Sequence, residues 1–327
     1  MRAVLCKAYG PPETLILEDI EPPVAGPDEA VVAITAAALN FYDTLIIAGK
    51  YQTKPPLPFS PCGEFAGVVE SVGARVTSVK PGERVMAYTA WNGAREKIAV
   101  AAHLLARVPD GLPDEVAAGL SVTYGTSLHA LRDRGRLQGG ETVAILGAAG
   151  GVGQAAIEIA KAMGARVIAC ASSDEKLAFC RSLGADNLIN YTRDDLKTAL
   201  KDLTGGNGVD VLYDPVGGDL AEPALRAMAW GGRYLVVGFA GGTIPRPPLN
   251  LVLLKGCALV GVFWGAHTAK EPARHRANMD QLLAWAAAGT IKPHIDKIYP
   301  LEEISAALGA IARREVKGKV IIRIKSR

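Results

Sequence analysis

Residues 142–153 read Thr-Val-Ala-Ile-Leu-Gly-Ala-Ala-Gly-Gly-Val-Gly, and this stretch decides the fold. Its first five residues are apolar and partly β-branched, which is typical of a short buried strand. A glycine-rich turn follows, and apolar residues then recur at helical spacing as far as Met163. A strand, a tight turn and a helix in this order are the context in which a glycine motif predicts dinucleotide binding.

The turn itself suits a diphosphate. Ala148, Gly150 and Gly153 occupy the three small-residue positions of a G-x-G-x-x-G motif. Gly150 has no Cβ to block a pyrophosphate, and Gly153 allows the helix to pack close to the strand. The N–H groups that begin the helix then face the phosphates with the positive end of the helix dipole. A glycine-rich turn without a ligand is the alternative. The residues expected to hold the diphosphate are Ala149, Gly150, Gly151 and Val152.

The end of the next predicted strand indicates which dinucleotide binds. An NAD-binding fold places a carboxylate about 20 residues beyond the glycines, where it binds the ribose 2′-OH. That position holds Ala171 here. Ser172 and Ser173 can donate hydrogen bonds to a 2′-phosphate, and Lys176 can neutralise its charge. The pattern from Ser172 to Glu175 also fits a helix capping box, and both interpretations can hold together. We interpret the segment as favouring NADP(H).

Composition limits the class of protein. A chain of 327 residues, 49% hydrophobic and 21% charged, can bury a full core and is long enough for about two domains. Its net charge of +3 is small, so we expect no nucleic-acid partner. The sequence contains no run of about 18 apolar residues, so we predict no membrane span. The first residues contain no long apolar signal segment, so we expect a cytoplasmic protein.

Cysteine and histidine show no ligand spacing. No cysteine pair has the C-x-x-C pattern, so we expect reduced, buried thiols and no cysteine-based zinc site. The histidines are dispersed, and we expect each to be a surface or hydrogen-bonded core residue rather than a ligand. The cysteines are Cys6, Cys62, Cys170, Cys180 and Cys257, and the histidines are His103, His129, His267, His275 and His294.

Two parts of the chain differ in pattern. Up to about residue 110, short β-like runs are broken by proline and glycine, which indicates a compact β domain. From about residue 115, strand and helix patterns alternate, which predicts a doubly wound parallel sheet with helices on both faces. The predicted strands of the first part are residues 4–8, 30–37, 65–72 and 84–88.

The last third contains a long apolar run, residues 249–264, which is interrupted only at Lys255 and Gly256. We expect it to form a buried strand pair, or an edge strand that pairs with a second copy. Residues 274–288 have helical spacing. Residues 320–324 read as a strand that returns to the first domain.

The whole chain resembles a zinc-free member of the medium-chain dehydrogenase/reductase superfamily, and it is similar to the NADPH:quinone oxidoreductases. This resemblance implies an α/β protein with a doubly wound Rossmann domain, residues 116–289, and a GroES-like β-rich domain, residues 1–115, completed by about residues 290–327. The matching stretches are residues 39–44, 58–67, 121–126, 147–153, 214–219, 238–244, 250–255 and 261–265.

The resemblance also implies that the catalytic zinc is absent. Zinc alcohol dehydrogenases of the superfamily hold the metal with a cysteine, a histidine and a second cysteine. The matching positions here hold Asn40, Gly63 and Ala118, none of which replaces a thiolate or an imidazole on Zn²⁺. We therefore expect hydride chemistry without a metal ion.

Further cofactor contacts are implied by the same resemblance. Tyr191 is expected to lie against the adenine or its phosphate, and Lys319 to reach the same end. The segment after the last apolar run is expected to lie along the nicotinamide, while the loop at residues 238–242 lines the cofactor through its backbone. The additional residues expected to bind NADP(H) are Asn40, Thr123, Tyr191, Gly238, Phe239, Ala240, Phe263, Trp264 and Lys319.

No Ser-His-Asp, Cys-His or paired-carboxylate set is evident, which fits an electron-poor acceptor that needs little acid catalysis. Tyr51 is our first candidate for a proton donor, because related enoyl reductases use a tyrosine from this lobe. Many quinone oxidoreductases have a tyrosine where this chain has Leu45. The candidates for orienting the acceptor or supplying a proton are Asn40, Tyr42, Asp43, Tyr51 and Thr123.

Three functions therefore remain open. The first is an NADPH-dependent quinone reductase, the second an NADPH-dependent enoyl or alkenal reductase that acts on C=C bonds, and the third a non-catalytic nucleotide-binding protein. Relatives usually dimerise through the edge of the Rossmann sheet, so we expect a homodimer that binds a small-molecule acceptor.

Overall fold

The computed structural model describes residues 1–324 and divides into two compact units. Unit 1 comprises Met1–Val122 together with Pro293 and the residues that follow it, and unit 2 comprises Thr123–Lys292. The boundary expected near residue 115 lies inside α2 (Asp114–Ala118), so the chain changes unit a few residues later. Residues 325–327, which we assigned to the first domain, lie outside the described residues.

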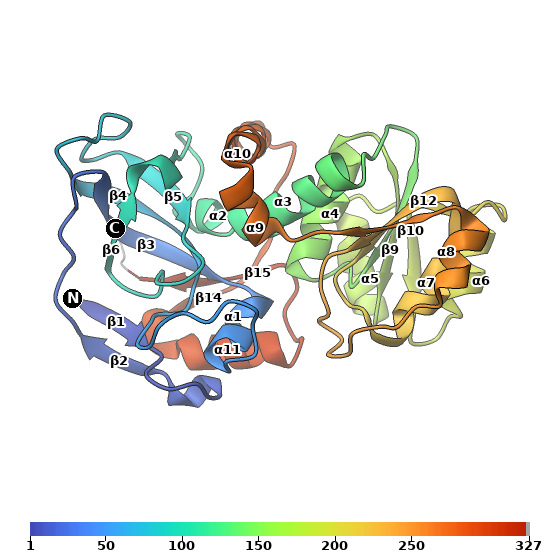
Figure 1. Ribbon diagram of the computed structural model, residues 1–327, viewed down its shortest axis with the longest axis horizontal. Helices are drawn as coiled ribbons and strands as arrows, with labels where there is room; N and C mark the ends of the chain where they lie inside the picture. The colour runs from blue at the N-terminus through green and yellow to red at the C-terminus, as the bar shows by residue number, and fades with distance from the viewer. Residues whose placement is uncertain (325–327) are drawn as a thin grey trace. The chain divides into compact units, whose positions relative to one another are not determined.

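Unit 1 is built on a sheet whose centre is β3 (Glu29–Leu39). β3 is apolar and almost entirely buried, and it pairs with β4 (Glu64–Val72) on one side and β15 (Lys319–Arg323) on the other. β15 therefore returns to the N-terminal domain, as predicted, and lies beside β3 although the two are far apart in the sequence (Figure 1). The other strands are β1 (Arg2–Leu5), β2 (Ile16–Asp19), β5 (Arg84–Tyr88), β6 (Lys97–Ala101), β7 (Ala106–Arg107) and β14 (Ile295–Pro300), and the remaining α-helices are α1 (Phe41–Ile47) and α11 (Ile304–Ala312).

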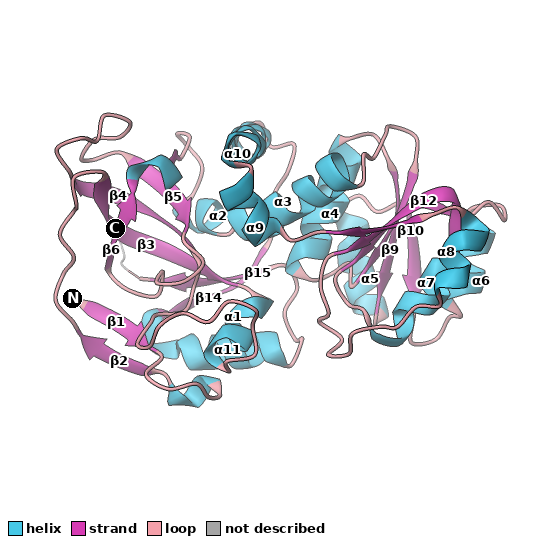
Figure 2. Ribbon diagram, in the orientation of Figure 1, coloured by secondary structure: helices cyan, strands magenta, loops and turns pink. Residues whose placement is uncertain are grey.

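Unit 2 contains a parallel sheet in the order β10-β9-β8-β11-β12-β13. Counted along this unit, the order is 3-2-1-4-5-6, that of a doubly wound dinucleotide-binding fold. Helices lie on either side of this sheet (Figure 2). The strands are β8 (Thr142–Leu146), β9 (Arg166–Ala171), β10 (Asn187–Asn190), β11 (Val209–Asp214), β12 (Met228–Val236) and β13 (Ala258–Gly261).

The helices of unit 2 include a π-helical segment, η3 (His129–Arg134), which continues α3. None of the helices formed by residues 1–324 combines the length and the apolar character that crossing a bilayer requires. The α-helices are α3 (Ser121–Leu128), α4 (Gly151–Ala162), α5 (Asp174–Ser182), α6 (Leu196–Leu203), α7 (Ala221–Arg226), α8 (Leu249–Lys255), α9 (Trp264–Lys270) and α10 (Pro272–Ala287).

The prediction of a strand pair at residues 249–264 is wrong for the first half of this segment. Leu249–Lys255 forms the helix α8, which Pro248 precedes and left-handed Gly256 ends, and only Ala258–Gly261 forms a strand. Proline before and glycine after a segment are helix boundary signals that outweighed the apolar run. β13 is still the edge strand of its sheet, as the second interpretation of this run required.

Candidate functional site

The glycine turn has the geometry that a diphosphate requires. Gly150 is the N-cap of α4 and supplies no side-chain cap, so the first N–H groups of the helix are available to an anion. A Cβ on Gly153 would lie 2.5 Å from the carbonyl oxygen of Gly147, so only glycine allows this close approach of helix and strand. A Cβ on Gly150 would meet protein only at 3.4 Å. The residues present therefore fit a dinucleotide.

The serines after β9 cap the next helix, but the predicted capping box from Ser172 to Glu175 is wrong by one residue, and phosphate binding here remains a prediction. Ser173 is the N-cap of α5, and its Oγ accepts a hydrogen bond from the N–H of Lys176 at 3.3 Å. The Nζ of Lys176 lies 3.4 Å from the Oγ of Ser172, which brings an ammonium and a hydroxyl together at a helix N-terminus. All three side chains are only partly buried. A phosphate is the natural ligand of such a set.

The acidic residue Asp174 at this end of α5 is paired with a neighbouring cation. The Asp174 carboxylate accepts a hydrogen bond from the Nδ2 of Asn190 at 2.9 Å and pairs with Arg193 at 3.2 Å, and these contacts lower its pKa. Arg193 is a largely exposed cation that the sequence analysis missed, because it follows β10 rather than β9. Tyr191, which lies between Asn190 and Arg193 in the sequence, is partly buried and packs against the hydrophobic core of unit 2.

The buried Asp214 shapes the loop after β11, and the loop after β12 is held against it. Its Oδ1 accepts hydrogen bonds from the N–H groups of Val216 and Gly217, both at 2.8 Å, and burial raises its pKa. The N–H of Ala240 donates to the carbonyl of Pro215 at 3.0 Å. The backbone of this loop is therefore held by β11, which fixes the positions of Gly238 and Phe239.

Phe263 and Trp264, which we expected to lie along the nicotinamide, differ in their exposure. Phe263 is 53% exposed, whereas Trp264 is 4% exposed. The indole packs so closely on Gly125 that a Cβ there would lie 2.8 Å from it. Trp264 is thus a core residue of unit 2, and Thr123, at 3%, is also buried. Side-chain contact with a cofactor remains a prediction for Phe263.

In unit 1, Asn40 and Asp43 form the start of α1. The N–H of Asn40 donates to Oδ2 of Asp43 at 2.8 Å, and the N–H of Cys62 donates to Oδ1 at 3.0 Å. Burial raises the pKa of Asp43 to about 7, although these two donors oppose the shift. Both oxygens of Asp43 hold the backbone. Asp43 therefore has a capping role at the start of α1. With both oxygens used in this way, the carboxylate has no oxygen left over for the predicted contact with substrate.

Lys319 lies in a buried polar cluster of unit 1. Its Nζ donates to the carbonyl of Leu39 at 3.2 Å, to Oδ1 of Asn40 at 2.8 Å and to Oε1 of Glu64 at 2.7 Å. These three bonds use all the donors of an ammonium group. Lys319 is only 2% exposed, and its predicted contact with the cofactor stays a prediction. The antiparallel register of β15 on β3 places Lys319 in this cluster.

Glu64 is the residue that the sequence analysis did not select. It is 0% exposed and accepts from Lys319, from the Nδ2 of Asn40 at 2.9 Å, and from the N–H of Val122 at 2.7 Å. We call Asn40, Glu64 and Lys319 the lysine cluster. The sequence around Glu64 does not indicate that its partner is Lys319, which lies near the other end of the chain.

The positions that match the catalytic zinc ligands do not suit that metal. A Cβ on Gly63 would lie 2.0 Å from the hydroxyl of Tyr42 and 2.7 Å from the backbone of Ala90, so an imidazole has no room. Ala118 is buried and offers no donor. Asn40 already contacts the ammonium of Lys319, which repels a second cation.

Tyr51 keeps the properties of a proton donor. Its side chain is half-buried, and its ring lies 5.5 Å from that of Tyr42. Burial and the nearby Asp43 carboxylate raise its pKa, so the phenol stays protonated at neutral pH. Leu45 is partly buried in α1 and supplies no aromatic ring.

Comparisons with known proteins agree with this geometry. Residues 26–110 match the alcohol dehydrogenase GroES-like domain, and residues 151–286 match the zinc-binding dehydrogenase family. A GroES-like unit joined to a doubly wound nucleotide-binding unit defines a medium-chain dehydrogenase/reductase. Within that superfamily, the chain belongs to the quinone oxidoreductase family.

Similar proteins cover nearly the whole chain. Quinone oxidoreductase-like protein 2 of Rattus norvegicus is 39% identical over 99% of this chain and 92% of its own length. Quinone oxidoreductase of Pseudomonas aeruginosa is 35% identical over 96% of this chain and 97% of its own. The crystal structure of Escherichia coli quinone oxidoreductase complexed with NADPH superimposes with a TM-score of 0.91 at 28% identity, covering 99% of this chain and 100% of that one.

Proposed function

We propose that this oxidoreductase is an NADPH-dependent quinone reductase that transfers hydride without a catalytic metal ion. The observation that carries the proposal is the lysine cluster, which puts a fixed ammonium beside Asn40, one of the positions that match zinc ligands in the alcohol dehydrogenases. The names of the relatives and the NADPH in a similar structure support the acceptor class and the cofactor.

NADPH, when bound, supplies a hydride from its nicotinamide ring. In our proposal, the uncapped start of α4 holds the diphosphate, and Ser172, Ser173 and Lys176 hold the 2′-phosphate. The buried ion pair fixes Asn40, so that the second N–H of its amide can orient the acceptor carbonyl. Tyr51 supplies the proton that a reduced acceptor takes up.

Replacing Lys176 with alanine is expected to raise the KM for NADPH about 10- to 100-fold. This factor corresponds to the free energy of one charge-assisted hydrogen bond to the 2′-phosphate. The KM for NADH should stay the same, because NADH has no 2′-phosphate. Initial rates with both cofactors measure the difference. Lys197→Ala, an exposed lysine in α6, is the matched control and should change neither value. Equal losses with NADPH and NADH would contradict the assignment.

A panel of acceptors separates the candidate functions. We expect oxidation of NADPH with 9,10-phenanthrenequinone or 1,4-benzoquinone, at a rate that a chelator leaves unchanged. Turnover of enals or enoyl thioesters, but not of quinones, would favour the C=C reductase, for which Tyr51 is the supporting observation. NADPH binding without turnover of any acceptor would indicate a non-catalytic protein. A rate that zinc restores after chelation would contradict the metal-free mechanism.

We further propose a homodimer through the outer edge of β13. The helix α8, which precedes β13 in the chain, carries exposed apolar side chains, with Leu253 at 78% and Leu254 at 67%. An unpaired strand edge and exposed apolar side chains are the kinds of surface that a second copy covers. Leu253→Glu with Leu254→Glu should convert a dimer to a monomer in light scattering. A monomeric wild-type protein at micromolar concentration would contradict this assembly.

A further inference from the structure

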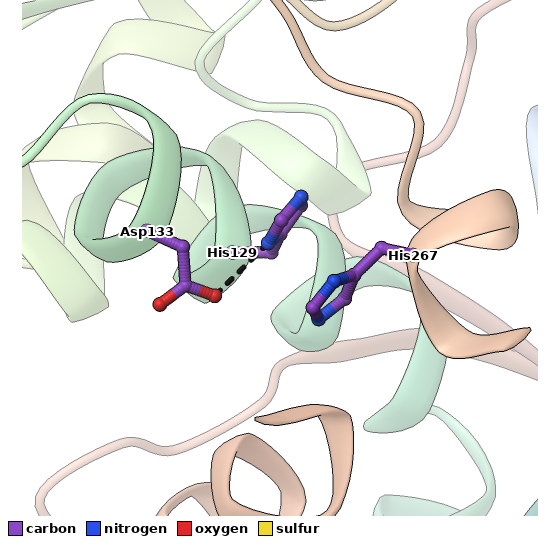
Figure 3. Close-up of side chains that lie close together, drawn as sticks. All are labelled: His129, Asp133 and His267. Carbon is purple, nitrogen blue, oxygen red and sulfur yellow. Dashed lines mark hydrogen bonds and ion pairs between the residues drawn. The ribbon is translucent and has the colours of Figure 1, made fainter. Parts of the chain in front are cut away.

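Three histidines from different helical elements lie close together in unit 2. His129 and Asp133 share one face of η3, four residues apart, and His267 comes from α9. Figure 3 shows the His267 ring facing that of His129, and the ring centroids are 3.8 Å apart. A third histidine, His275 of α10, has its ring centroid 6.3 Å from that of His267. We call His129, Asp133 and His267 the histidine cluster.

His267 is the unexplained member of this cluster. It is 5% exposed, and neither of its ring nitrogens has a hydrogen-bond partner. Its Nδ1 lies 3.6 Å from a carboxylate oxygen of Glu271, which is beyond hydrogen-bond distance. Buried polar groups normally find partners, so an unpaired imidazole at this depth points to a missing ligand.

The distances within the cluster suit one small cation. One potential ligand atom from each of the three residues lies within 4.8 Å of the other two. The Nδ1 of His129 is 2.9 Å from Oδ2 of Asp133. Ligands at about 2.0–2.1 Å from a tetrahedral ion are about 3.3 Å apart, so the site needs only a small expansion on this side.

We propose that the histidine cluster binds one divalent transition-metal ion, with Zn²⁺ as the ion that best matches two imidazoles and a carboxylate. The two rings are nearly parallel, at 14°, and one ion cannot lie in both ring planes. Binding therefore requires one ring to turn. His267 is the ring that turns, because no hydrogen bond holds it.

Neighbouring groups support the proposed ligands. The Nδ2 of Asn278 donates to Oδ2 of Asp133 at 2.9 Å, and the Nε of Arg132 lies 3.4 Å from Oδ1, so the carboxylate is held in place. Arg132 also opposes a cation, but Asp133 and Glu271 bring two negative charges to the cluster.

Titration of chelator-treated protein with Zn²⁺ and with Co²⁺ tests the proposal. We expect one Zn²⁺ per chain. The Co²⁺ form should show visible d–d absorption without the near-ultraviolet band that a thiolate ligand gives, which excludes the buried cysteines as ligands. Saturating Zn²⁺ should raise the Tm of the wild-type protein, a measurement that needs no variant.

Variants locate the site. His267→Gln and His129→Gln should each weaken Zn²⁺ binding at least about 100-fold. His103→Gln, which removes an exposed histidine of unit 1, should leave it unchanged. No Zn²⁺ bound by the wild type, or binding that survives in His267→Gln, would overturn the proposal. Oxidation of NADPH by metal-free His267→Gln is measured separately. This variant should still oxidise NADPH, so that a failure of the metal site can be distinguished from a failure of the proposed function.

Discussion

The variant Lys319→Met is expected to lower the free energy of unfolding by about 3–5 kcal/mol. Lys319 and Glu64 are 2% and 0% exposed, so methionine would leave the carboxylate of Glu64 buried without its counter-charge. It would also remove the donor to Oδ1 of Asn40. Urea unfolding followed by circular dichroism measures the loss.

Two further variants show that the buried charge causes this effect. Lys7→Met breaks the exposed pair with Glu18 and should cost less than about 1 kcal/mol. Adding Glu64→Gln to Lys319→Met removes the unpaired charge and should restore part of the lost stability. If Lys319→Met unfolds no more easily than Lys7→Met, the lysine cluster does not have the role described here.

Gly150→Val should weaken NADPH binding by about 100-fold or more, while leaving the Tm within a few degrees of the wild type. The Cβ at this position meets the carbonyl oxygen of Gly147 at an ordinary 3.4 Å, and the backbone is extended, so the fold tolerates valine. The same side chain adds bulk beside the uncapped N–H groups of α4, where a diphosphate must approach closely. Titration of the fluorescence of NADPH measures the affinity.

Gly139→Val is the matched control for Gly150→Val. A Cβ on Gly139 would have a similar clearance, 3.5 Å from the carbonyl oxygen of Met163, and the residue is exposed before β8. It should bind NADPH like the wild type. Gly153→Val should instead lower the Tm, because its Cβ would lie 2.5 Å from a backbone oxygen. Normal NADPH binding by Gly150→Val would exclude this turn as the diphosphate site.

Local patterns were enough to predict the doubly wound unit. β8 has the predicted bounds, because a short apolar run before a glycine-rich turn leaves few alternatives, and in the other unit β5 does as well. Residues 249–255 were mistaken for a strand, since an apolar run alone does not distinguish a strand from a short helix. There the capping residues, rather than the apolar pattern, decided the structure.

The two side-chain clusters were beyond the reach of sequence patterns. Lys319 meets Asn40 only because β15 pairs with β3, and this register depends on the whole sheet. His267 meets His129 through the packing of α9 against η3, with no ligand spacing in the sequence. The one local signal was the spacing of His129 and Asp133, four residues apart on a helical face.

The initial rate of 9,10-phenanthrenequinone reduction, measured with NADPH and with NADH on the same protein, is the most direct test of the proposed activity. We predict turnover with a kcat/KM at least about tenfold higher for NADPH, because one charge-assisted contact to the 2′-phosphate is worth at least that factor. Equal values for the two cofactors would contradict the phosphate site at Ser172, Ser173 and Lys176. No turnover with either cofactor would contradict the proposed activity itself.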